Sequence, residues 1–159
     1  MDILMNYLII GKMRIVFFLI TLSFLACGTD QGSTDTYTYI VQNQSGVGIK
    51  IIGYVTFTNV EEYVINLKNG EEISKVFKDG LPPRGYSWNS FFGSSNGNSG
   101  ADSIKVIYNN VKFKDFNFDN LSDERNPLGP NHNNGELKAT YTISQEDYQN
   151  AEDCNGNCE

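Results

Sequence analysis

The sequence is poor in the residues that most hydrolytic and metal-dependent enzymes use at their active sites. Its 159 residues include one histidine, His132, one tryptophan, three cysteines and four prolines. A Ser-His-Asp triad would have to use His132, and no nucleophile elbow surrounds any serine. The Gly-rich segment Gly93 to Gly100 is not followed by the lysine and helix start of a phosphate-binding loop. The sequence therefore predicts a non-enzymatic protein with no catalytic residues and no cofactor.

A hydrophobic run long enough to cross a membrane as a helix is also missing. The apolar run from Ile15 to Ala26 has twelve residues, whereas a transmembrane helix needs about 20. Lys12 and Arg14 precede this run, and a positive flank before a short apolar core is typical of a secretory signal peptide. Translation from Met13 would give a more compact leader than translation from Met1, and both starts stay open.

The apolar run ends in "FLAC", Phe24 to Cys27. This motif resembles a bacterial lipobox, although Phe24 stands where leucine is usual and Leu25 where a smaller residue is common. The resemblance covers only the leader. It implies that residues 1–26 are removed and that acylated Cys27 anchors the protein in a lipid bilayer, with fatty acids such as palmitate. The alternatives are ordinary signal-peptidase cleavage after Gly28 and an uncleaved anchor.

The resemblance also bears on localisation. Gly28 follows the cysteine and does not resemble the aspartate that retains lipoproteins in the inner membrane. The C-terminal stretch is similar to that of small, uncharacterised lipoproteins of Gram-negative bacteria. These features imply attachment to the outer membrane, on its periplasmic or its surface face. Residues 27–36 contain no apolar residue after the cysteine, which predicts a flexible tether before a single domain of residues 37–159.

The charge balance excludes one class of partner. Ten Lys and Arg stand against eighteen Asp and Glu after residue 26, a formal charge of −8. Such a domain repels phosphate backbones, so we expect no nucleic-acid binding. It is equally unsuited to electrostatic attraction by anionic lipids, so the anchor alone has to hold the membrane.

The mature sequence reads as strands and turns. Nineteen asparagines in the full chain, all but Asn6 after the leader, and many aromatic residues favour strands with tight turns over helices. A strand is predicted over 37–42, and a longer one over 47–58 with a bulge or bend at Gly53. Ser144 to Asp147 has capping-box spacing, which predicts a short C-terminal helix after a strand over 140–143.

Two hairpins are expected. One connects strands on either side of Asn69-Gly70, with Ile65 opposite Ser74 or, in the preferred register, opposite Ile73. The other turns at Asn109-Asn110, with Tyr108 facing Val111 and Val106 facing Phe113.

Together these elements predict an all-β protein, an antiparallel β-sandwich of about seven or eight strands with one short C-terminal helix. A closed β-barrel is the alternative.

The two remaining cysteines, Cys154 and Cys158, lie close together near the C-terminus. An even number of cysteines in an exported protein indicates a disulfide. Free thiols and a metal site are the alternatives, and zinc would need four ligands, with His132 the only histidine available.

The aromatic residues Tyr86, Trp88 and Phe92 are the most distinctive surface candidate. On one strand face they would form a platform for stacking on sugar rings or clamping peptides. The competing interpretation is that they belong to the core, where aromatic residues usually lie.

Two further groups of oxygen-bearing side chains are candidates for chemistry. Asp115, Asn117 and Asp119 alternate as at the start of a calcium loop, but the required glycine is Asn120 and position twelve is Asn126. The acidic pairs at 61–62 and 71–72 could supply carboxylates for acid-base catalysis, or they protect strand edges.

The resulting functional hypothesis is a membrane-anchored envelope lipoprotein with a binding or structural role, in which a glycan or an envelope protein is the partner. The alternatives are a carboxylate-dependent hydrolase of envelope polymers and a subunit of an envelope complex.

Overall fold

The computed structural model describes residues 34–55, 63–93, 100–132, 136–156 and 158. The leader, Cys27 and the tether as far as residue 33 lie outside these residues, so the predictions made for them stay predictions. The unit of residues 34–159 is the one described below.

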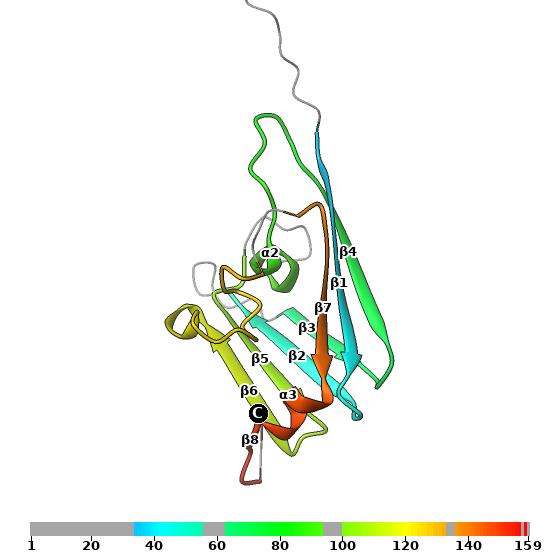
Figure 1. Ribbon diagram of the computed structural model, residues 1–159, viewed down its shortest axis with the longest axis vertical. Coiled ribbons are helices and arrows are strands. Elements are labelled where there is room, and N and C mark those ends of the chain that lie inside the picture. The colour runs from blue at the N-terminus through cyan, green and yellow to red at the C-terminus, as the bar shows by residue number, and fades with distance from the viewer. Residues whose placement is uncertain (1–33, 56–62, 94–99, 133–135, 157, 159) are drawn as a thin grey trace, which may run out of the picture. The chain divides into compact units, whose positions relative to one another are not determined.

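The strands form two sheets, which confirms the predicted sandwich (Figure 1). The first sheet has the order β4-β1-β7, and β1 pairs antiparallel with β4 and parallel with β7. The second is antiparallel throughout, in the order β3-β2-β5-β6-β8. The strands are β1 (Thr36–Gln44), β2 (Ile49–Tyr54), β3 (Tyr63–Leu67), β4 (Glu72–Lys78), β5 (Ser103–Tyr108), β6 (Lys112–Asn117), β7 (Lys138–Ser144) and β8 (Glu152–Asp153). Within the described residues, the short helices are α2 (Trp88–Phe92), η2 (Phe118–Asn120) and α3 (Gln145–Gln149).

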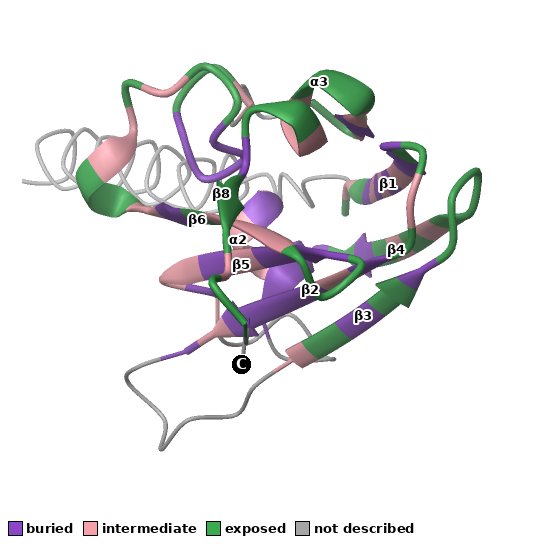
Figure 2. Ribbon diagram, turned by 90° about the horizontal axis from the view of Figure 1, so that it is seen from below, coloured by how far each residue is buried: buried purple, intermediate pink, exposed green. Residues whose placement is uncertain are grey.

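The core lies between the sheets and follows the period-two alternation of the strands. On β1, Tyr37, Tyr39 and Val41 are buried, while the residues between them are half-exposed. Figure 2 shows that burial is densest on β2 and β5, the central strands of the larger sheet, and sparser on β3 and β4, which are edge strands. The core is therefore built by the middle of each sheet.

The segment 86–92 is wrongly predicted as a strand, because residues 88–92 form α2. This helix packs against β2 at Gly53, where any Cβ would overlap the carbonyl oxygen of Phe92. Glycine is thus required at this position for a close approach of two backbones, which replaces the predicted bulge.

The expected hairpin around Asn69-Gly70 is also wrong. Residues 63–67 pair with β2 and residues 72–78 pair with β1, so the connection crosses from one sheet to the other. Gly70 does adopt the left-handed conformation, with φ of 83°. Ile65 and Leu67 on β3 and Phe77 on β4 face the same core from opposite sides, and this arrangement is as compatible with the alternation as a hairpin would be.

The hairpin of β5 and β6 is confirmed, but its register differs by one residue. Tyr108 pairs with Lys112 and Ile107 pairs with Phe113, because Val111 joins the two left-handed asparagines in a three-residue connection. A shift of one residue moves every side chain to the other face of a strand. Phe113 consequently packs on the outer face with Ile107 instead of facing Val106.

The C-terminal predictions agree with the structure. β7 leads into α3, whose capping box joins Ser144 and Asp147. Cys154 and Cys158 are joined as a disulfide, with their Cα atoms 5.0 Å apart. Cys158 is buried against Ile52 on the outer face of the larger sheet, so the disulfide holds the tail over a small apolar cluster there.

Candidate functional site

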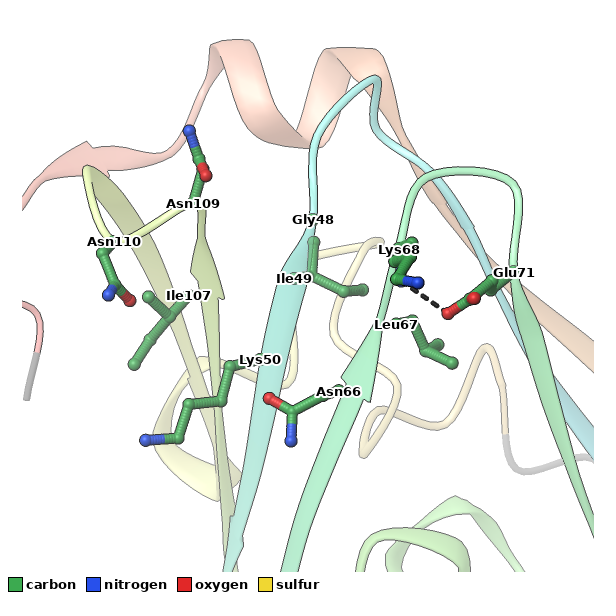
Figure 3. Close-up of a pocket in the computed structure, with 10 residues that line it drawn as sticks. All are labelled: Gly48, Ile49, Lys50, Asn66, Leu67, Lys68, Glu71, Ile107, Asn109 and Asn110. Atoms are coloured by element: carbon green, nitrogen blue, oxygen red, sulfur yellow. Dashed lines mark hydrogen bonds between the residues drawn. The ribbon is translucent and has the colours of Figure 1, made fainter.

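A groove of about 460 Å³ opens at the end of the larger sheet where β2 begins and β3 and β5 end (Figure 3). It lies at the opposite end of the strands from the start of β1, because β1 and β2 run in opposite directions through the sandwich. The groove is lined by Gly48, Ile49, Lys50, Asn66, Leu67, Lys68, Glu71, Ile107, Asn109 and Asn110.

A buried asparagine fixes the connection between β1 and β2 that forms one rim. Asn43 is fully buried, and its amide nitrogen donates to the carbonyl oxygens of Val47 at 2.8 Å and Leu67 at 3.1 Å. Its side-chain oxygen accepts from the backbone N–H of Ser45 at 3.1 Å and from the Ser45 hydroxyl at 2.6 Å. The turn and the end of β3 are therefore held together by one side chain.

The connection between β3 and β4 forms a second rim. The Glu71 carboxylate accepts from the backbone N–H of Lys68 at 2.8 Å, the contact marked in Figure 3. The side-chain oxygen of Asn69 accepts from the backbone N–H of Gly46 at 2.9 Å. These bonds hold the two turns against each other.

The side chains that line the groove are amides, ammonium groups, the carboxylate of Glu71 and a few apolar residues. Lys50 and Asn66 are direct cross-strand partners whose side chains lie on the same face of the sheet (Figure 3). Ile107 lies on the neighbouring strand, and the exposed Asn109 and Asn110 close that side. Amides donate and accept hydrogen bonds, so this arrangement suits a ligand rich in hydroxyl or carboxylate groups.

The predicted aromatic platform is not on the surface. Trp88 and Phe92 are each 1 % exposed, and Trp88 packs with its ring centroid 5.0 Å from that of Tyr39. Tyr86 is half-buried and stacks on Phe77 at 4.7 Å. The structure thus agrees with the core interpretation of these residues.

The residues predicted as calcium ligands have structural roles in a strand and a helix cap. Asn117 accepts from the backbone N–H groups of Asp119 and Asn120 and so caps η2. Asp115 lies on β6, directly across from Lys105. Within the described part of the chain, no group of three or more His, Cys, Asp or Glu side chains could hold a metal ion. The alternation that resembles a calcium loop is therefore the end of a strand and a capped turn.

A charged cluster near α3 was not foreseen from the sequence. The guanidinium of Arg125 binds Asp147 through two nitrogens, at 2.7 and 2.6 Å, and Lys114 lies 3.0 Å from Asp123. Burial alone would raise the pKa of Asp147, but the hydrogen bonds from Arg125 and Ser144 outweigh it and lower the pKa. These carboxylates are therefore held ionised, which suits a structural role better than that of a general acid.

Lys75 is the most unusual cation of the described residues. It lies on the inward-facing side of the edge strand β4, with its Nζ 3.6 Å from the ring centroid of Tyr63 on the edge strand β3. It also donates to the carbonyl oxygen of Phe91. Burial lowers the pKa of Lys75 to about 8. An inward-pointing charge at a sheet edge discourages pairing with another chain.

A second hollow, of about 330 Å³, lies beside the connection between β4 and α2. The carboxylate of Asp79 shapes this connection by accepting from the backbone N–H groups of Gly80, Arg84 and Gly85 at 2.8–3.1 Å. The bonds from Arg84 and Gly85 lower the pKa of Asp79. Leu81 is left 57 % exposed at the turn.

Comparison with family models, curated proteins and solved structures finds no match to this chain. Among the described residues, no helix combines the length and the hydrophobicity that crossing a membrane requires. The functional conclusions below therefore depend on the residues and the geometry of this chain.

Proposed function

We propose that this protein is a bacterial envelope lipoprotein that is anchored through acylated Cys27 and binds a ligand without catalysing a reaction. The observation that supports the anchor is the short apolar run with a positive flank that ends in Ala26-Cys27. Two or three acyl chains hold a protein on a bilayer durably, whereas one chain binds only weakly.

Membrane fractionation of the expressed full chain tests the anchor. Cys27→Ser removes the acyl acceptor, so we expect this variant to leave the membrane fraction. Cys154→Ser is the matched control, because it also replaces one cysteine but should leave the protein attached. Equal distribution of the Cys27→Ser variant and the wild type would contradict the proposal.

The groove supports the binding role. It presents Asn66, Asn109 and Asn110 together with Lys50 and Lys68, at the end of the domain opposite to the start of β1. Several amides over an apolar residue suit the hydroxyl groups of a glycan, and the two lysines favour one that bears carboxylates. The ligand class we propose is therefore an acidic glycan of the envelope.

An NMR titration with oligosaccharide fragments of the host's own envelope polymers tests this site. We expect the amide signals of Asn66, Asn109 and Asn110 to shift, and Asn66→Leu to weaken binding about tenfold, the effect of roughly one lost hydrogen bond. Asn131→Leu, at an exposed asparagine outside the groove, should bind as the wild type does. Shifts confined to other residues, or unchanged binding by Asn66→Leu, would contradict the assignment.

Two of the described carboxylates do not suit the hydrolase alternative, although burial raises the pKa of a third, Asp115. Asp123 and Asp147 are paired with cations, and a glycosidase-type general acid needs a raised pKa. His132 bonds the carbonyl oxygen of Glu124 through Nε2 at 2.8 Å. A role as subunit of an envelope complex stays a separate hypothesis.

A further inference from the structure

The start of β1 and the connection after β4 lie side by side. Thr36 pairs with Lys78, and the backbone N–H of Asp79 donates to the carbonyl oxygen of Asp35 at 2.9 Å. Figure 1 shows the connection projecting from the end of β4 next to the first residues of β1. Whatever holds the N-terminal end of β1 near a surface therefore holds this connection near the same surface.

The length of the intervening chain sets how near that surface is. Eight residues separate Cys27 from Thr36, which span roughly 28 Å at full extension and about 16 Å as a flexible chain. An anchor at Cys27 would thus keep the start of β1 closer to the membrane surface than the thickness of the bilayer itself.

The connection has the chemistry of a membrane-surface contact. Leu81 is 57 % exposed, and Lys78 and Arg84 line the hollow beside it. Asp79, the one carboxylate among the described residues that line this hollow, is 4 % exposed and accepts hydrogen bonds from backbone N–H groups. An apolar tip beside two cations matches the interface, where acyl chains meet phosphate groups.

The same end carries a second exposed apolar residue and a third cation. Leu137 is 49 % exposed and precedes Lys138 at the start of β7, which runs parallel to β1. Asp35 and Glu136 lie next to the starts of β1 and β7, so with Asp79 these three carboxylates match the three cations in number.

We infer that residues 79–85 form a second membrane contact, in which Leu81 enters the interfacial layer of the bilayer while Lys78 and Arg84 bind lipid phosphates. This inference rests on the proposed anchor at Cys27, which raises the effective concentration of the loop at the membrane. The contact orients the domain, and the groove then points away from the bilayer.

Fluorescence quenching by brominated lipids tests the contact. The acylated full chain with Leu81→Trp is reconstituted in phosphatidylethanolamine–phosphatidylglycerol vesicles, with or without bromine on the acyl chains. Val76→Trp is the matched control, because Val76 is 64 % exposed on β4 and lies outside the loop. The buried Trp88 contributes the same background to both variants.

We expect at least twofold stronger quenching in Leu81→Trp than in Val76→Trp, and Arg84→Gln in the Leu81→Trp background should reduce it. Equal quenching in the two tryptophan variants, in protein whose mass includes acyl chains, would overturn the membrane contact and leave the anchor standing. A mass without acyl chains would instead overturn the anchor, and this inference with it.

Discussion

Lys75→Met should remove a pH dependence of stability that the structure assigns to one partly buried ammonium group. Burial lowers the pKa of Lys75 from 10.5 in the unfolded chain to about 8 in the folded protein. The unfolded state therefore binds more protons between these two values, and stability rises with pH across that window. Burial of the charged ammonium lowers the free energy of unfolding most below pH 8, and this loss disappears above pH 10.5.

The magnitude follows from the size of the shift. At 1.36 kcal/mol per pKa unit, the full shift corresponds to about 3.4 kcal/mol, of which about 2 kcal/mol is recovered between pH 7 and 9.5. Lys75 is only partly buried, and its contact with the Tyr63 ring favours the charged form. These two effects reduce the expected gain to about 1 kcal/mol.

Urea unfolding, followed by the fluorescence of the buried Trp88, measures this gain. The wild type should gain about 1 kcal/mol relative to Lys75→Met between pH 7 and 9.5, and the scan stops there because burial raises the pKa of Tyr108 and Tyr141. Stability that depends on these protonated tyrosines is lost at higher pH. Lys78→Met removes an exposed lysine of the same strand and should keep the wild-type dependence. Parallel curves for Lys75→Met and the wild type would refute the reasoning.

Three further substitutions test the packing of the domain by urea or thermal unfolding. Gly53→Ala should lower the free energy of unfolding by about 3 kcal/mol or more, because its Cβ overlaps backbone atoms of Phe92. Gly80→Ala is the control and should be near neutral, because a Cβ there meets no atom within 4 Å. Equal unfolding midpoints for the two variants would contradict the close approach of β2 and α2. Asn126→Ala should cost about 2–4 kcal/mol, since its fully buried amide bonds four backbone and side-chain groups, and a loss below about 1 kcal/mol would speak against it. Cys154→Ser should cost at most about 2 kcal/mol, because the disulfide closes a short loop, and its stability should no longer respond to reducing agents.

The sequence could predict where strands and helices lie better than which strands pair with each other. Alternation identified β1, β2 and β5, and the spacing of Ser144 and Asp147 identified the start of α3. Alternation does not say which sheet a strand joins, so β3 and β4 looked like a hairpin although they belong to opposite sheets. Register failed for a similar reason, since one extra residue in a turn, Val111, moves the whole following strand by one position.

The candidate sites were harder to predict, because exposure depends on tertiary contacts. Trp88 and Phe92 are chemically suited to ligand stacking, but α2 buries them between the sheets. The groove was missed because Lys50 and Asn66 occupy the outward positions of strands, where polar residues are expected in any case. The signal in the sequence was a pair of asparagine-rich turns. That these turns lie at the same end of the sheet becomes apparent only when β3 is placed beside β2.

The central claim is that the mature protein begins at an acylated Cys27, and the intact mass of protein extracted from membranes of its own host tests it most directly. We predict the mass of residues 27–159 plus acyl chains, lighter by two hydrogens for the disulfide of Cys154 and Cys158. The mass of an unmodified chain that begins at residue 29 would contradict the anchor, and with it the orientation of the domain at the membrane.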